Sequence, residues 1–194
     1  MKINSYHRTD SLSFPLPLHH SICIGEAIWN EEGRFFIFAG LDERLVTELK
    51  RLSQDTRDTE LRKHTSDRAR FGKGAYEEWY AKGRTPFALI EQKTGALAAL
   101  AWLGPKAMPA GSAPPLPNQQ TLAYRCYPKF RGRGLMKDFV NFVITTYLAS
   151  VPNATLWTEV NTENTASSAL AEKLGFKTIK TKETERKKII MIRG

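Results

Sequence analysis

The stretch TLAYRCYPKFRGRGLM, residues 121–136, is the most informative part of this sequence. Its first seven residues, Thr121 to Tyr127, have a composition typical of a β-strand, and Pro128 ends that strand. A short basic loop with two glycines follows at 129–134. Apolar residues then recur at helical spacing and predict a helix of roughly 15 residues that begins at Leu135. The stretch is therefore expected to form a strand–loop–helix unit.

A glycine-bearing loop before a helix is a recurring binding site for anions. The first N–H groups of a helix have no partner within the helix, and the helix dipole places partial positive charge there. Gly132 and Gly134 allow the backbone to approach an anion closely, because they lack a Cβ atom. Arg131, Arg133 and Lys137 add full positive charges. We therefore predict that this loop binds a pyrophosphate group.

Two familiar phosphate-binding motifs are absent. The chain has neither the Gly-x-x-x-x-Gly-Lys-Ser/Thr motif of Walker-type NTPases nor the Gly-x-Gly-x-x-Gly motif of dinucleotide-binding domains. The loop also has the composition of an Arg-Gly-Gly segment that contacts RNA. Such segments are usually repeated, whereas this one is single and lies between a strand and a helix, so the anion-binding interpretation is preferred.

The pattern along the chain predicts an α/β fold, a sandwich of helices around a mixed sheet. Residues 104–120 contain five of the ten prolines and are expected to form a surface loop. Residues 1–30 are treated as an N-terminal extension of unclear structure, with a strand allowed at 22–29, and residues 31–194 as the domain. The expected strands are 34–38, 87–91, 96–103, 121–127, 156–160, 177–183 and 187–193, and the expected helical segments begin near 43, 58, 135 and 166.

The composition excludes several classes of protein. With 41% hydrophobic residues the chain is ordinary for a folded protein, and no run approaches the ~18 apolar residues that a membrane span needs. Its first residues lack the apolar segment of a secretory signal. Cys23 and Cys126 are too few and too far apart for a disulfide scaffold or a zinc site. We expect a reduced, cytoplasmic protein with no membrane partner.

Positive charge is concentrated in the last third of the chain. The net charge is +9, and residues 121–194 carry 13 basic and 6 acidic side chains, against 16 and 14 in residues 1–120. Such an imbalance suggests an anionic partner: nucleic acid, a membrane surface or a phosphorylated ligand. Aromatic residues are not interleaved with the basic ones at 177–193, which disfavours nucleic acid.

The segment from Tyr127 to Gly134 resembles the acetyl-CoA loop of the GCN5-related N-acetyltransferase (GNAT) superfamily, whose pattern is Arg/Gln-x-x-Gly-x-Gly/Ala after a strand. Arg131 and Gly134 match this pattern, and Met136 departs from it. A second block of the family is a strand, then an asparagine, then a helix that ends in Leu-Gly-Phe. Here Asn164 follows the strand at 156–160, and Leu174-Gly175-Phe176 ends the next helix. The resemblance covers about residues 85–194.

The resemblance implies a mixed, mostly antiparallel sheet flanked by helices, with acetyl-CoA as the acyl-donor substrate and no metal. Cys126 and Tyr127 on the strand edge would contact the pantetheine arm, as an added strand would. Asn164 would contact the donor near its thiol end, although it also suits the N-cap of the following helix, and both roles are compatible. The residues that would hold the pyrophosphate are Arg131, Gly132, Arg133, Gly134, Leu135 and Met136.

Direct transfer of an acetyl group to an amine needs a base, a polarised carbonyl and an acid for the leaving thiolate. The resemblance implies that a backbone N–H at 126–127 polarises the carbonyl. The family's usual acid, a tyrosine seven residues after the asparagine, is replaced here by Ala171. Tyr124 or Cys126 could supply the proton instead, and Glu159 could act as the base, directly or through water. Each also has a structural alternative: Tyr124 could be a core aromatic residue, Cys126 a small buried residue, and Glu159 the partner of a lysine in a salt bridge.

The sequence thus predicts an acetyl-CoA-dependent N-acetyltransferase that acts on a primary amine of a small molecule or a peptide. The acceptor would lie against residues 41–82, the N-terminal segment and the proline-rich loop, which have no recognisable pattern. One alternative is a non-catalytic acyl-CoA-binding protein of the same fold, which Ala171 favours. A basic nucleic-acid-binding protein ranks behind it, and a homodimer is left open.

Overall fold

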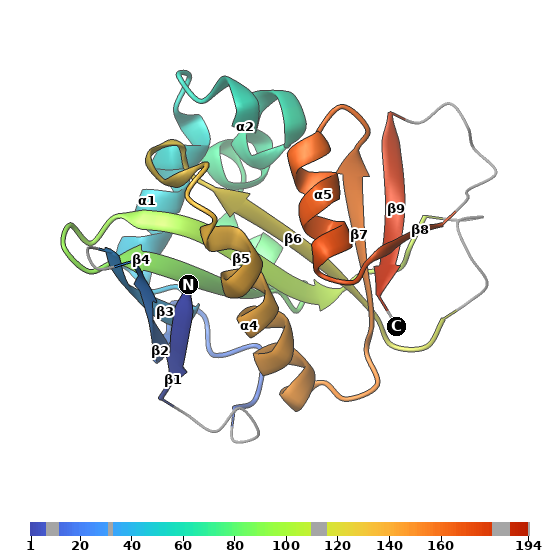
Figure 1. Ribbon diagram of the computed structural model, residues 1–194, viewed down its shortest axis with the longest axis horizontal. Helices are drawn as coiled ribbons and strands as arrows, with labels where there is room; N and C mark the ends of the chain where they lie inside the picture. The colour runs from blue at the N-terminus through green and yellow to red at the C-terminus, as the bar shows by residue number, and fades with distance from the viewer. Residues whose placement is uncertain (7–11, 31–32, 110–115, 180–186, 194) are drawn as a thin grey trace.

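The computed structural model describes residues 1–6, 12–30, 33–109, 116–179 and 187–193, and in them one sheet carries helices on both faces (Figure 1). The strands are β1 (Lys2–Ser5), β2 (Ser21–Trp29), β3 (Gly33–Gly40), β4 (Thr85–Glu91), β5 (Leu97–Pro105), β6 (Gln119–Cys126), β7 (Thr155–Asn161), β8 (Lys177–Ile179) and β9 (Lys188–Arg193). The helices are α1 (Glu43–Gln54), α2 (Thr59–His64), α3 (Tyr76–Tyr80), α4 (Leu135–Ser150) and α5 (Thr165–Lys173), with a π-helical turn η2 (Arg68–Lys73) and a 3-10 turn η3 (Pro128–Phe130).

The sheet is antiparallel except at one place. Its strand order is β1-β2-β3-β4-β5-β6-β7-β9-β8, and β6 and β7 form the parallel pair. The helix α4 connects these two strands, as a parallel connection requires. This arrangement confirms the predicted α/β fold with a mixed, mostly antiparallel sheet flanked by helices.

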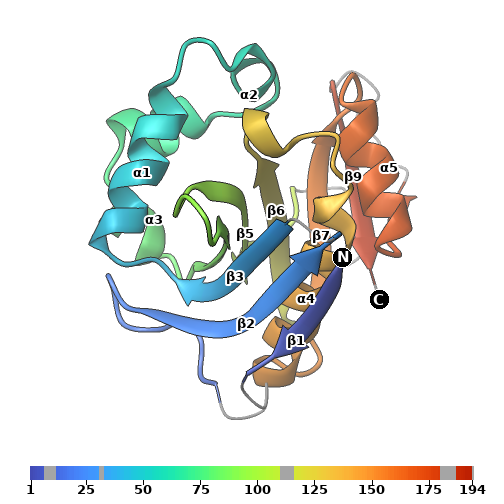
Figure 2. The same cartoon turned by 60° about the vertical axis from the view of Figure 1, so that its left-hand side comes forward.

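Two hydrophobic cores lie on opposite faces of the sheet (Figure 2). The core on one face is built with α4 and α5, and the core on the other with α1, η2 and α3. The strands β4 and β5 are buried on both faces, which explains why 87–91 and 97–103 are almost continuously apolar. We call these the α4 face and the α1 face.

Strands β6 and β7 separate along their length. Their pairing covers only Gln119–Thr121 against Thr155–Trp157, and the two strands then diverge toward their carboxyl ends (Figure 1). Beyond Thr121 the edge of β6 that faces β7 forms no further pairs with it in the described residues, and we call the region between the two diverging strands the opening. The phosphate loop predicted at 129–134 follows directly after the end of β6.

Most predicted elements are confirmed, and the N-terminal segment is the main addition. Residues 22–29 do form a strand, and residues 2–5 form a further one that the sequence did not indicate; both pair within the same sheet. The predicted strand 177–183 is observed over Lys177–Ile179, and its remainder lies outside the described residues. No helix in the described part of the chain is long and apolar enough to span a membrane.

Candidate functional site

The loop at 131–134 has two glycines in a left-handed backbone conformation. Gly132 and Gly134 have φ angles of +74° and +73°, in the left-handed region that residues with a Cβ atom rarely adopt. A Cβ atom built on either glycine would meet no heavy atom within 4 Å, so the space beside the loop is open. Gly134 is also the N-cap of α4, and the first amides of that helix lie at the loop.

The side chain of Arg131 is engaged within the protein. Its two terminal nitrogens donate to both carboxylate oxygens of Asp58 at 2.8 and 2.6 Å, and its Nε donates to the carbonyl of Cys126 at 2.8 Å. The carboxylate of Asp58 is buried, and Asp58 also caps the start of α2. The Arg131 guanidinium therefore ties the loop to α2, and all three of its nitrogens are engaged within the protein.

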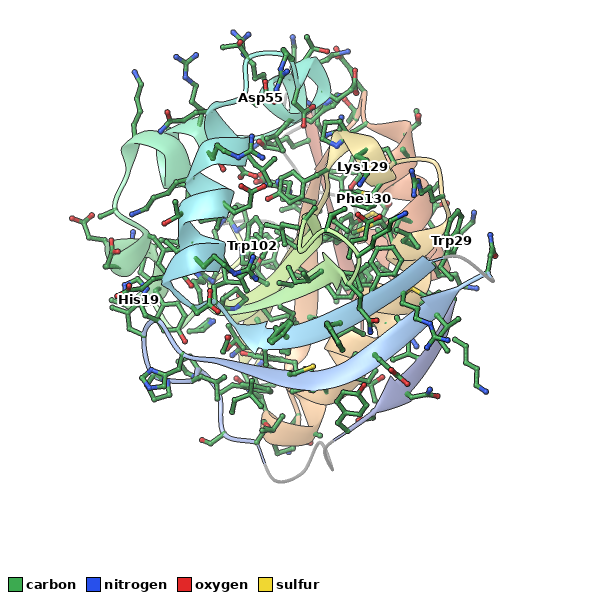
Figure 3. The ribbon with its side chains drawn as sticks, turned by 90° about the vertical axis from the view of Figure 1, so that its left-hand side faces the viewer. His19, Trp29, Asp55, Trp102, Lys129 and Phe130 are labelled. Carbon is green, nitrogen blue, oxygen red and sulfur yellow. The ribbon has the colours of Figure 1, made fainter. Side chains whose placement is uncertain are left out.

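Arg133 has a different environment from Arg131. Its guanidinium lies over the rings of Trp29 and Phe130, at 5.6 and 5.4 Å from their centroids, and Figure 3 shows both rings on the same side of the molecule. The ammonium of the neighbouring Lys129 forms an ion pair with the carboxylate of Glu91, at 2.8 Å. Stacking on two rings positions the Arg133 charge beside the loop.

The free edge of β6 directs a backbone donor into the opening. The N–H of Tyr127 donates to the carbonyl of Ala98 on β5, at 3.0 Å. Since successive backbone groups of a strand point to alternate edges, the N–H of Cys126 points away from β5, toward the opening. Of the two amides that the sequence indicated at 126–127, only that of Cys126 faces the opening.

The side chain of Tyr124 reaches from β6 to the first turn of α5. Its hydroxyl donates to the carbonyl of Ser167 at 2.9 Å and accepts from the Ser167 hydroxyl at 3.1 Å. Asn164 caps the same turn, because its side chain accepts from the N–H of Ser167 at 3.0 Å. The structural alternative proposed for Asn164 is therefore observed. Burial raises the pKa of Tyr124, and the hydrogen bond with Ser167 partly offsets this shift, so the phenol remains protonated near neutral pH.

Cys126 lies on the same face of β6 as Tyr124. Burial raises the pKa of the Cys126 thiol to about 11, against smaller opposing effects of Arg131 and Arg133. The group is thus a neutral thiol rather than a nucleophilic thiolate at neutral pH.

This pKa predicts slow alkylation of Cys126. At pH 7.5 iodoacetamide is expected to modify Cys126 about 100-fold more slowly in the native protein than in urea, since the thiolate fraction falls about tenfold per pKa unit. Peptide mass spectrometry over time measures the rate, and a Cys23→Ala variant removes interference from the other cysteine. Native and unfolded rates within threefold of each other would contradict the buried thiol.

Glu159 lies on the opposite face of the sheet from Tyr124 and Cys126. Side chains alternate between the two faces along a strand, and Thr121 of β6 pairs with Trp157 of β7. The odd-numbered residues of β6 and β7 therefore share one face of the sheet, which is the α1 face. The carboxylate of Glu159 accepts from Lys188 Nζ at 3.2 Å and is 27% exposed. The predicted salt bridge to a lysine is thus present, and the carboxylate remains accessible to water.

The sequence did not reveal two acidic residues of the site, Asp58 and Asp67. Asp67 accepts from Arg125 Nε at 2.5 Å and from Arg70 at 2.7 Å, and its side chain is 1% exposed. Asp58 precedes Thr59 as an ordinary helix cap, and no local pattern links it to Arg131, 73 residues away. In the sequence, the only indication of these two acidic residues was the surplus of arginines in the segment that they contact.

A separate hollow lies away from these residues. It has a volume of about 540 Å³ and is lined by α1 residues between Glu43 and Glu48 and by the turn Thr94–Ala96. None of the predicted site residues lines it. Within the described residues, no three His, Cys, Asp or Glu side chains gather closely enough to hold a metal ion.

Comparisons with known proteins agree with this geometry. The family model of the GNAT acetyltransferase domain matches residues 41–177, more than half of the chain. No curated protein sequence matches significantly.

Several solved structures share the fold at low sequence identity. The GNAT domain of S. lividans PAT is 11% identical, with a TM-score of 0.61 over 87% of this chain and 94% of that one. The ribosomal-protein-S5-alanine acetyltransferase of Vibrio fischeri is 10% identical, with a TM-score of 0.56 over 87% and 95%. Mycobacterium smegmatis RimJ, solved in complex with CoA-disulfide, is 14% identical, with a TM-score of 0.58 over 81% of each chain.

The parallel β6–β7 pair that opens, the glycine loop at the start of α4 and the match over residues 41–177 all point to one family. The chain belongs to the GNAT acetyltransferase family.

Proposed function

We propose that this protein is an N-acetyltransferase that transfers an acetyl group from acetyl-CoA directly to a primary amine. The observation that carries this proposal is the early end of the β6–β7 pairing at Thr121, which leaves the Cys126 amide directed into an opening beside the phosphate loop. An extended pantetheine arm would add to this edge as a short strand does. The pyrophosphate would meet the amides of 132–136, supplemented by the charges of Arg133 and Lys137.

The candidate catalytic groups lie on opposite faces of the sheet at this opening. Glu159 on the α1 face would accept a proton from the amine, directly or through water, as the C–N bond forms. The Cys126 amide would stabilise the negative charge on the carbonyl oxygen. Tyr124 on the α4 face would give its proton to the thiolate sulfur as the C–S bond breaks, and a proton from solvent would restore the phenol. An amine that enters from the α1 face would attack the thioester carbonyl carbon to form a tetrahedral intermediate, which would collapse to the amide as the thiolate leaves.

The first test is a thermal-unfolding titration with acetyl-CoA. At a free concentration of ~100 Kd, ligand that binds only the folded state adds about 2.7 kcal/mol of stability. We expect this stabilisation in the wild type and its loss in Gly134→Trp, because an indole would fill the open space beside the loop.

The control is Gly175→Trp, which places the same side chain on a left-handed glycine at the far end of α5. This variant carries a comparable backbone strain, yet it should keep the full acetyl-CoA stabilisation. If the wild type is not stabilised, or if both variants lose the effect equally, the proposed donor site is wrong.

One alternative is a non-catalytic acyl-CoA-binding protein. Ala171 favours it, because this residue is fully buried and places no hydroxyl at the family's usual acid position. Release of CoA thiol in the presence of a panel of amines separates the two proposals. Stabilisation by acetyl-CoA without amine-dependent thiol release would favour the binding protein.

A further inference from the structure

The cations of the loop before α4 differ in whether their donor groups already have partners. All three nitrogens of Arg131 donate within the protein, and the ammonium of Lys129 is paired with Glu91. The guanidinium of Arg133 forms no hydrogen bond and no ion pair with any described residue; its recorded contacts are with two aromatic rings. The glycines on either side of Arg133 are exposed. Its donor groups are therefore available to a ligand at the loop.

The two rings that hold the Arg133 guanidinium come from distant parts of the chain. The guanidinium lies 5.6 Å from the ring centroid of Trp29 and 5.4 Å from that of Phe130. Phe130 is buried and ends the turn directly before the loop, whereas Trp29 is the last residue of β2 (Figure 3). A guanidinium over a ring keeps its N–H groups at its own edge, where they can still donate. The rings thus restrict Arg133 without using its donors.

The indole of Trp29 is itself fixed by the end of the β2–β3 pair. Trp29 pairs with Gly33 across these two strands. A Cβ atom on Gly33 would meet the indole Cε3 at 2.9 Å, so a residue without a Cβ atom allows the ring to lie across this backbone. The indole also packs against the core of the α4 face. The sheet therefore sets the position of Trp29, independently of the loop that it contacts.

Trp29 lies outside the part of the chain that carries the family resemblance. It precedes residues 41–177, which match the GNAT family model. The sequence alone left residues 1–30 without a role. Because β2 pairs with β3 in the central sheet, it nevertheless brings an aromatic side chain to the loop before α4. The contact is thus contributed by this chain's own N-terminal segment.

We propose that Trp29 is a positioning residue of the donor site: its ring holds the Arg133 guanidinium beside the glycines of the loop, where the guanidinium pairs with the pyrophosphate of acetyl-CoA. This inference rests on the proposed function, because it takes acetyl-CoA as the ligand. An arginine side chain that is already ordered loses less conformational entropy on binding, so the preformed contact increases affinity. Without the ring, Arg133 would keep its charge, but the ligand would have to order it.

The test is a double-mutant cycle, measured by calorimetric titration of acetyl-CoA. Trp29→Leu should raise the Kd about fivefold, as expected for the loss of a cation–π contact. Arg133→Gln should raise the Kd about 10-fold, because it removes a charge-assisted hydrogen bond to phosphate. If Trp29 acts through Arg133, adding Trp29→Leu to Arg133→Gln should raise the Kd by less than about twofold more. Trp29→Phe keeps a ring face and should remain within about twofold of the wild type.

The control is Tyr6→Leu, which removes an exposed aromatic side chain from the same N-terminal segment. The N–H of Tyr6 donates to the carbonyl of Ile24, and five residues of β2, about 17 Å, separate Ile24 from Trp29. The Kd of this variant should equal that of the wild type. Circular dichroism checks the fold of each variant before titration. Trp29→Met, which also lacks a ring, takes the place of Trp29→Leu in the cycle if the leucine variant is unfolded.

The outcomes separate this inference from the proposed function. A weakening by Trp29→Leu that disappears in the Arg133→Gln background supports the positioning role. An unchanged Kd in the ring-less variant, or additive effects of the two substitutions, would overturn that role and leave the proposed donor site standing. Absence of acetyl-CoA binding by the wild type would overturn the proposed function, and this inference with it.

Discussion

Replacement of Asp67 by alanine is expected to lower the free energy of unfolding by about 3–5 kcal/mol, because it removes the carboxylate of a buried ion pair and leaves its cationic partners behind. The Asp67 side chain is 1% exposed, and that of Arg125 is 16% exposed, so water replaces the lost contacts poorly. Arg70 loses the same partner. Urea unfolding followed by circular dichroism measures the change.

Two controls separate this charge effect from a general loss of packing. Arg57→Ala removes an ion pair of similar length, with Asp55 at 2.9 Å, but the Arg57 side chain is 83% exposed and no measurable change is expected. The double variant Asp67→Ala/Arg125→Met should recover part of the loss, since it removes one of the uncompensated charges. A loss below about 1 kcal/mol for Asp67→Ala would mean that the arginines are solvated without their partner.

Replacement of Tyr124 by phenylalanine is expected to lower kcat about 100-fold, which is the usual contribution of a general acid. The substitution keeps the ring and removes only the hydroxyl that bonds to Ser167 at 2.9 Å. As the proposed general acid, Tyr124 would act only while its hydroxyl is protonated. Because burial raises the pKa of Tyr124 above its ordinary value near 10, the Tyr124-dependent part of kcat should persist to pH 10 and fall only above it.

A matched control tests whether this hydroxyl acts chemically or only holds α5 in place. Ser167→Ala removes the side-chain donor to Tyr124 but keeps the backbone acceptor, and kcat should change less than threefold. Unfolding and the KM for acetyl-CoA should be similar in Tyr124→Phe and Ser167→Ala. A kcat for Tyr124→Phe within threefold of the wild-type value would mean that solvent, and not Tyr124, supplies the proton to the leaving thiolate.

Local patterns were sufficient for most of the fold. The apolar spacing from Leu135 predicts α4, and Gly175 followed by Phe176 predicts the end of α5, because helix periodicity and caps are short-range features. The glycines at 132 and 134 likewise indicate the backbone geometry of the loop before α4, since their φ angles depend on the missing Cβ atom. The strand at residues 2–5 was not predicted, because four residues at a sheet edge carry too little periodicity.

The sequence by itself therefore determined the α/β class, the glycine loop before α4 and the strand that leads into it. Only the tertiary structure decided how the charged groups are used: Arg131 pairs with Asp58, and Arg125 shares Asp67 with Arg70. The physical reason is the distance along the sequence over which each interaction acts. Turns, caps and periodicity depend on neighbours in sequence, whereas each ion pair depends on which distant elements the two cores bring together.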